Sequence, residues 1–348
     1  MPLVLVSSDA FERHLTPPGH PERPERAHVF DAVATAWRAG GGEVRAPRPA
    51  TLDELAAVHD REHLERIAGT AGRAAMLDPD TFTSPESYEL ARLAAGATLV
   101  GVDHAMAGGG PALVLVRPPG HHAERDRAMG FCLFNNAAVA AAYARRKGAS
   151  RVAVVDIDVH HGNGTQQIFE DDPAVLYLST HQYPCYPGTG AVTEVGVREG
   201  RGRTVNVPIE PGAGDDDYAQ VLAEVVVPVL TAFAADLTIL SVGYDAHVQD
   251  PLAQMQVTTA GYRAMLAALR AAADAVSAGR LVVVTEGGYD LPALGACLEA
   301  TVEVLAAPAG PAAPAASAAA PRASGPGVRG REAVAAALAV QRPFWPLV

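Results

Sequence analysis

Short apolar runs recur along the chain, separated by segments with a different hydrophobic spacing. The runs are rich in Val, Leu and Ile and have the length of buried strands. We expect strands at residues 3–8, 112–116, 152–155, 174–178, 204–207, 237–242 and 281–285. A continuous apolar run, rather than strict alternation, is typical of a strand that is covered on both faces.

Most segments between these runs carry apolar residues at helical spacing. Helices are expected at residues 25–39, 52–59, 61–68, 84–106, 135–147, 215–233, 258–278, 291–305 and 332–340, and a turn is expected at residues 78–81. Strands that alternate with helices indicate an α/β fold, with a mostly parallel central sheet flanked by helices.

One segment departs from this pattern. Residues 307–330 are low-complexity Pro, Ala and Gly, which we interpret as a disordered or poorly ordered loop rather than a domain linker. The helix at residues 332–340 would then return to the body, with Phe344 and Trp345 as apolar anchors. We therefore expect residues 1–348 to form a single domain.

Composition narrows the class of protein. Of the 348 residues, 49% are hydrophobic and 19% are charged, as in soluble globular proteins. The net charge of −12 argues against a nucleic-acid-binding surface, which is normally basic. The charge suits a basic partner, such as a lysine-rich protein or a polyamine, but many cytosolic proteins are equally acidic.

Cysteine usage and the N-terminus indicate a compartment. Cys132, Cys185 and Cys297 are widely spaced without a CxxC pair, so neither a thiolate zinc site nor a disulfide framework is predicted. Residues 1–11 lack the basic start of a signal peptide. No apolar stretch approaches the ~20 residues that a membrane span needs. We expect a cytoplasmic protein with reduced thiols and no membrane contact.

Five of the apolar runs are followed by His, Asp or Tyr beside glycines. In parallel α/β sheets, ligands bind beyond the carboxyl ends of the strands, so these five segments are expected to meet at one rim. They are residues 117–122 (RPPGHH), 156–164 (DIDVHHGNG), 179–183 (STHQY), 241–247 (SVGYDAH) and 285–289 (TEGGY). This distribution favours an active site over a chance cluster of surface polar residues.

A metal site is the first hypothesis for this rim. In an extended chain Asp156, Asp158 and His160 share one face, and two carboxylates with an imidazole are costly to bury without a cation. Asp245, from another strand end, can supply a third ligand beside Asp158 and His160, as catalytic zinc requires, while Fe²⁺ and Co²⁺ stay open. Gly243, where a bridged pair of metals would want a carboxylate, favours a single metal.

The neighbouring motifs offer acid–base chemistry. His121 and His122 follow a rigid Pro-Pro-Gly turn, and a histidine there can take a proton from a metal-activated water. Asp156 would fix such a histidine from behind. Tyr289, after two glycines, can stabilise an oxyanion. The alternatives are that both histidines are further metal ligands and that Tyr289 only packs. No motif marks a cysteine as a nucleophile.

Together these motifs resemble the histone deacetylase superfamily, which includes bacterial histone deacetylase-like amidohydrolases and acetylpolyamine amidohydrolases. The resemblance begins at residues 20–26 (HPERPER) and reaches the C-terminal helix. It also rests on residues 117–123 (RPPGHHA), 130–136 (GFCLFNN), 156–164, 186–190 (YPGTG), 241–247 and 286–291 (EGGYDL). It implies a three-layer arginase-like α/β fold and a zinc-dependent deacetylase.

The resemblance also implies a role for each matching position. The zinc ligands would be Asp158, His160 and Asp245. His122 would be the general base, with His121 as its electrostatic partner and Asp156 behind His121. The phenol of Tyr289 would polarise the acetyl carbonyl. The substrate tunnel would be lined by Gly130, Phe131, Tyr186 (where phenylalanine is commoner) and Leu252. A structural potassium ion would be held by Asp156, Asp158, His160 and Ser179.

The resemblance leaves the substrate between two classes. Asn163 and Glu286 are similar to class II enzymes. Leu252 stands where polyamine-selective relatives carry an acidic residue, so an acetylated lysine peptide or protein is favoured over an acetylated small amine. An acetylpolyamine amidohydrolase is the alternative, and a non-catalytic metal-dependent binding module is a third reading. Asp80 is a further candidate for the rim, and a homo-oligomer is left open.

Overall fold

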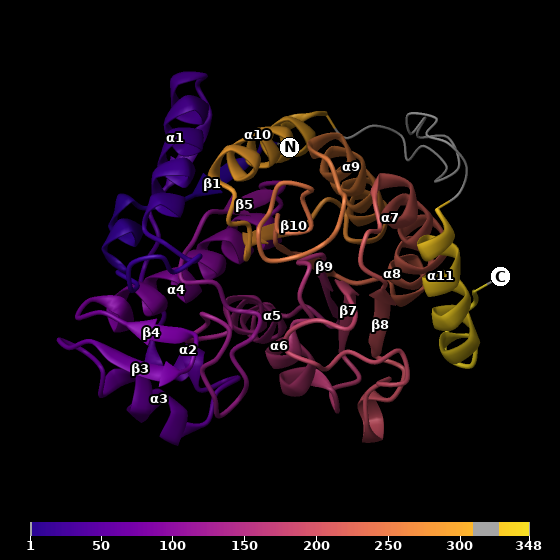
Figure 1. Ribbon diagram of the computed structural model, residues 1–348, viewed down its shortest axis with the longest axis horizontal. Helices are drawn as coiled ribbons and strands as arrows, with labels where there is room; N and C mark the ends of the chain where they lie inside the picture. Colours follow the sequence, from indigo (N-terminus) through magenta and orange to yellow (C-terminus); the bar gives the residue numbers. More distant parts are fainter. Residues whose placement is uncertain (1, 309–326, 348) are drawn as a thin grey trace.

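A parallel sheet forms the centre of the protein (Figure 1). The computed structural model describes residues 2–308 and 327–347, and within them eight strands pair in the order β2-β1-β5-β10-β9-β6-β7-β8, each pair parallel. The strands are β1 (Val4–Val6), β2 (Glu43–Arg45), β5 (Ala112–Val114), β6 (Val152–Asp156), β7 (Val175–Gln182), β8 (Thr204–Ile209), β9 (Leu237–Val242) and β10 (Leu281–Thr285). The predicted α/β class with a mostly parallel sheet is confirmed.

Helices cover both faces of this sheet. They are α1 (Glu25–Ala39), α2 (Leu52–Leu55), α3 (Arg61–Ala68), α4 (Ser87–Met106), α5 (Asn136–Arg146), α6 (Asn163–Phe169), α7 (Asp215–Val221), α8 (Val227–Phe233), α9 (Thr259–Val276), α10 (Leu291–Ala306) and α11 (Val328–Gln341). Because successive strand residues face opposite sides, Ala153 and Val155 pack in one core with α1 and α7–α11, and Val152 and Val154 pack in the other with α2–α6. The continuous apolar runs reflect these two cores.

The order of the strands brings the polar motifs together. The five strands whose ends carry them, β5, β10, β9, β6 and β7, are consecutive neighbours in the sheet. From β6 the chain proceeds through β7 to the edge strand β8 and then returns to β9, on the other side of β6. The β6–β9 junction is therefore a topological switch point, where open α/β sheets place their ligand sites.

Helix caps fix two motifs close to this junction. The side chain of Asp290 accepts a hydrogen bond from the Ala293 N–H and begins α10 directly after Tyr289. Asn135 caps α5 in the same way, by accepting from the Ala138 N–H. Such caps satisfy backbone donors that a helix start leaves free, and they hold the preceding loops in a defined place.

Several short elements differ from the predictions. The strand β2, the hairpin β3 (Ala75–Asp78) and β4 (Thr81–Thr83), and the helix α6 were not predicted, because they are short and lack a clear hydrophobic period. The helix predicted at residues 52–59 ends at Leu55. The helix predicted at 215–233 is interrupted by a π-helical turn, Leu222–Val226, which precedes Pro228, a residue without the N–H that a regular helix needs.

The C-terminal segment is described only in part. Residues 309–326, most of the loop predicted at 307–330, lie outside the described residues, and α11 begins at Val328 rather than at residue 332. The anchoring role of Trp345 is confirmed, since its indole is buried and donates to the Gly202 carbonyl oxygen over 3.1 Å. Among the described helices, none is long and apolar enough to cross a membrane.

Candidate metal centre

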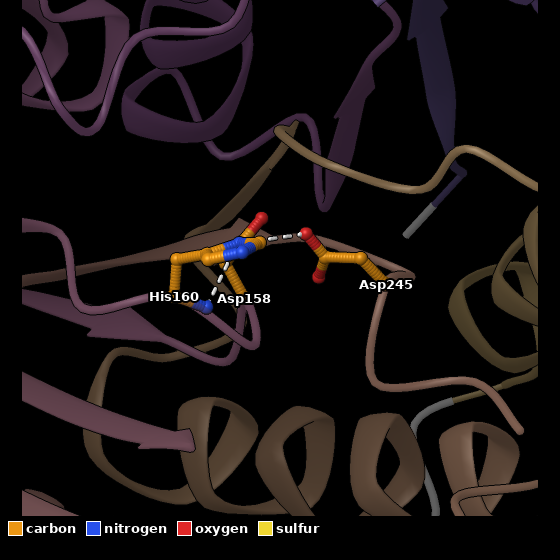
Figure 2. Close-up of side chains that lie close together, drawn as sticks. All are labelled: Asp158, His160 and Asp245. Carbon is orange, nitrogen blue, oxygen red and sulfur yellow. Dashed lines mark hydrogen bonds and ion pairs between the residues drawn. The ribbon is translucent and has the colours of Figure 1, made fainter. Parts of the chain in front are cut away.

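Three buried side chains converge at the switch point (Figure 2). Asp158 and His160 follow β6, and Asp245 follows β9. One ligand atom from each lies within 4.8 Å of the other two. His160 Nδ1 is 3.1 Å from Asp158 Oδ1 and 3.1 Å from Asp245 Oδ2. The structure thus brings together the three residues that the sequence nominated as ligands.

The electrostatic field among these three side chains favours a positive charge. Burial lowers the pKa of His160, but its hydrogen bonds to Asp158 and Asp245 outweigh burial and raise that pKa well above its usual value. Burial, followed by the neighbouring Asp158, raises the pKa of Asp245. Two buried carboxylates and one imidazole are a donor set that suits a divalent cation. These three residues therefore fit a metal ion.

Backbone donors hold the two carboxylates in place. The Gly287 N–H donates to Asp158 Oδ2 over 2.9 Å, and the Val159 N–H donates to Asp245 Oδ1 over 3.0 Å. The glycines of these loops leave the necessary room. A Cβ on Gly243 would lie 1.8 Å from Asp158 Oδ2, and one on Gly287 would lie 2.1 Å from Asp245 Oδ2. The sequence had indicated only that Gly243 is not a carboxylate; its packing role was missed.

His121 lies against Asp156. Its Nδ1 is 3.0 Å from Asp156 Oδ2, and its Nε2 is 3.8 Å from Asp158 Oδ1. Burial alone would lower the pKa of His121, but Asp158 and Asp156 raise it to about 10. These two carboxylates therefore favour the protonated form of His121. The structure places Asp156 beside His121, as the sequence suggested.

His122 has the opposite electrostatic character. Burial, and then the charges of His121 and His160, lower the pKa of His122 well below its usual value. Its Nδ1 is 2.8 Å from Asn163 Oδ1, and the Asn163 amide NH₂ donates to Glu124. With that amide so oriented, Nδ1 carries the proton and Nε2 keeps its lone pair. His122 is thus a neutral imidazole with a free basic nitrogen.

Glu286 joins the histidine turn to the sheet, a role the sequence reasoning missed. Its buried carboxylate accepts from the Gly120 and His121 N–H groups, over 2.7 and 3.1 Å, and from the Ser241 hydroxyl over 2.7 Å. A carboxylate directly after an apolar run is the signal that could have found it. In the sequence alone, Glu286 indicates only a similarity to class II enzymes.

Aromatic side chains flank the centre. The Tyr186 ring is 5.1 Å from the His122 ring, with 38% of the residue exposed. The Phe131 ring is 5.9 Å from the buried Tyr289 ring. Burial raises the pKa of Tyr289 well above its usual value, so its phenol is protonated. A Cβ on Gly130 would lie 2.4 Å from His122 Cδ2, which explains the glycine at that position.

The remaining nominated residues lie around this group. Ser179 is the strand partner of Asp156, and its hydroxyl is 2.9 Å from His181 Nδ1. Leu252 is half-buried, and Asp80 accepts from the Gly130 N–H over 3.2 Å. The three cysteines are free. Burial raises the pKa of Cys132 well above its usual value and that of Cys297 to about 11, so neither thiol is an activated nucleophile.

Comparisons with known proteins agree with this geometry. A family model described as "Histone deacetylase domain" matches residues 20–305. Histone deacetylase 15 of Arabidopsis thaliana is 41% identical over 356 residues, covering 99% of this chain and 61% of that protein. The histone deacetylase-like amidohydrolase of Pseudomonas aeruginosa is 41% identical over 292 residues, covering 82% of this chain and 77% of that protein. The crystal structure of the HDA15 HD domain superposes with a TM-score of 0.90 at 39% identity, covering 99% and 95% of the two chains.

Proposed function

The chain belongs to the histone deacetylase family, and we propose that it is a metal-dependent amidohydrolase that removes acetyl groups from acetylated lysine or a similar primary amine. The observation that carries this proposal is the buried group of Asp158, His160 and Asp245 beside a neutral histidine, His122, and a protonated phenol, Tyr289. These are the parts that hydrolysis of an amide requires.

Zn²⁺ is the metal we propose, with Fe²⁺ or Co²⁺ as alternatives for the same ligands. Asp158, His160 and Asp245 would hold it. A cation of this kind polarises a carbonyl and lowers the pKa of water. Three protein ligands with room for substrate are the pattern of catalytic zinc sites. Two observations support this choice of metal: the match to the histone deacetylase domain, and the donor set of two carboxylates and one imidazole.

The side chains of this chain would then divide the proton transfers. His122, neutral and with a free Nε2, would accept the proton of the attacking water and return it to the amine nitrogen as the C–N bond breaks. His121, charged through its contacts with Asp156 and Asp158, would stabilise the negative charge that develops. The Tyr289 phenol would donate a hydrogen bond to the oxyanion, which is worth on the order of 10²–10³ in rate.

We propose that the substrate reaches this site through a narrow, apolar arm. We propose that Gly130, Phe131, Tyr186 and Leu252 line the passage for the lysine side chain. Leu252 carries no charge that would attract the second amine of a polyamine, which favours an acetylated lysine in a peptide or protein. For the structural potassium ion we propose Asp156, Asp158, His160 and Ser179, since β6 and β7 place Asp156 and Ser179 side by side.

A substrate panel tests the proposal. Acetyl-lysine peptides, acetylputrescine and acetylspermidine are incubated with one preparation whose metal content is measured, and released acetate is quantified. Turnover of the peptides supports the lysine deacetylase, and turnover of the polyamines alone supports the alternative. A metal-loaded protein that turns over none of these substrates contradicts both deacetylase proposals and favours a non-catalytic metal-dependent binding module. His122→Ala, with exposed His28→Ala as its control, should abolish turnover without loss of metal.

A further inference from the structure

The turn that carries Tyr289 is held from both sides by charged side chains. The buried Arg26 donates from Nε to the Gly288 carbonyl oxygen over 2.9 Å and from Nη2 to the Glu286 carbonyl oxygen. The Tyr244 N–H donates to the Gly287 carbonyl oxygen over 3.1 Å. The carbonyl groups of the turn are thereby fixed before any substrate arrives.

Asp250 meets the N–H groups of the same turn. Its Oδ2 accepts from the Tyr289 N–H over 2.7 Å and from the Asp290 N–H over 3.3 Å. The second oxygen, Oδ1, accepts from the Leu252 N–H over 3.0 Å. One carboxylate therefore connects the backbone of Tyr289, the cap of α10 and the backbone of Leu252.

The position of Asp250 is costly for a carboxylate. The residue is only 7% exposed, and burial, followed by the neighbouring Asp245, raises its pKa. Removing a buried acceptor from backbone donors leaves those donors unsatisfied, which costs free energy. A neutral or apolar side chain would avoid the repulsion from Asp245 but would release the turn.

From this geometry we propose that Asp250 is a positioning residue that holds the Tyr289 phenol in place and links it to the Leu252 loop. The inference rests on the proposed function and deepens it, because it assigns how the phenol is oriented. Among the described residues, the Asp250 carboxylate accepts hydrogen bonds from the backbone of Tyr289, Asp290 and Leu252 and from no metal ligand. Asp250 therefore acts through the backbone of Tyr289. A displacement of the phenol by about 1 Å would cost on the order of 100-fold in rate.

A double-mutant cycle with Tyr289→Phe tests the inference. Asp250→Asn keeps the shape of the side chain but offers a single acceptor oxygen, so either Tyr289 or Leu252 loses its partner. We expect kcat to fall by about 10-fold in Asp250→Asn and by about 100-fold in Asp250→Ala, with KM changed by less than about threefold. In the Tyr289→Phe background the same substitutions should change the residual kcat by less than about twofold.

The controls separate positioning from a general loss of structure. Exposed Gln249→Ala should retain wild-type kcat, and metal content and Tm are measured for every variant. Equal losses of kcat in both backgrounds, a loss of metal in Asp250→Asn, or unchanged kcat in Asp250→Ala would each overturn the inference while the wild-type chain deacetylates the peptide. Absence of turnover in the wild-type chain would overturn the proposed function and the inference together.

Discussion

This site depends on glycines that leave space as well as on residues that supply functional groups. The Asp158 and Asp245 carboxylates lie together because Gly243 and Gly287 bring no Cβ between them. A side chain at either glycine would push one ligand out of position. Metal binding should therefore depend on residues that contribute no ligand atom.

Gly243→Ala tests this dependence. The new Cβ would lie 1.8 Å from Asp158 Oδ2 and 2.7 Å from Asp245 Oδ1. We therefore expect the variant to lose most of its metal and its activity to fall by at least about 100-fold. Gly295→Ala is the matched control, because its Cβ meets only Val29 Cγ1, at 3.6 Å. Metal per chain is measured by elemental analysis. A Gly243→Ala protein with a full complement of metal would show that the ligands do not need the space at Gly243.

Sequence reasoning nominated side chains that the structure brings together, but it missed the contacts by which Glu286 and Asp250 hold the neighbouring turns. Asp158 and His160 were identifiable because period-two spacing at a strand end places them on one face. The role of Glu286 depends on Gly120 and His121, which are distant in the sequence. The same is true of Asp250 and its contact with Tyr289. Such contacts become visible only once the strands are ordered.

Between elements, a buried charged cluster fastens the N-terminal loop to the sheet. Glu22, which precedes α1, accepts from Arg26 over 2.9 Å and from Arg117, after β5, over 2.8 Å at each oxygen. All three side chains are fully buried. Burial raises the pKa of Glu22, but Arg117 and then Arg26 outweigh it and lower the pKa to about 2.

This shift predicts a pH dependence of stability. The pKa of Glu22 lies below its usual value of 4.5 in the folded protein, so its contribution is present above pH 4.5 and is lost as the pH falls from 4.5 towards 2. The contribution is on the order of 3 kcal/mol. In metal-free protein, the free energy of unfolding should fall more steeply over this window in the wild type than in Glu22→Gln.

Glu22→Gln should also be destabilised at pH 7, by about 3–5 kcal/mol, because two guanidinium groups would be left without their carboxylate. Exposed Glu25→Gln serves as the control and should follow the wild type throughout the pH series. Denaturant unfolding at a series of pH values measures the difference. Parallel pH profiles for the wild type and Glu22→Gln would show that this cluster does not act as described.

The long strands and helices were the most predictable part of the fold. Long apolar runs gave the sheet strands, and strongly periodic segments gave helices such as α3, whose predicted bounds of 61–68 match Arg61–Ala68. The short β2, β3 and β4 were missed because neighbours in space, rather than local pattern, stabilise them. The order of the strands was not predictable from the pattern either, although the expectation that their ends share one rim was sound.

The net charge of the molecule does not discriminate between an acetyl-lysine peptide and an acetylpolyamine. A substitution at Leu252 tests this selectivity more directly. Leu252→Glu should raise kcat/KM for acetylspermidine relative to an acetyl-lysine peptide by about 10-fold at low salt, because a nearby carboxylate attracts the second amine. The gain should shrink as salt is added. Gln254→Glu, which places the same charge on the same loop at an exposed position, should give a smaller change. Equal effects of both substitutions would remove Leu252 from the selectivity argument.

The proposed function requires that the group of Asp158, His160 and Asp245 holds a metal on which deacetylation depends. It is tested most directly by measuring acetate release from an acetyl-lysine peptide together with metal per chain, after chelation and after addition of Zn²⁺. We expect about one catalytic metal per chain, loss of activity on chelation, recovery on addition of Zn²⁺, and neither metal nor activity in Asp245→Asn. Full acetate release from metal-free protein, or from Asp245→Asn, would contradict it.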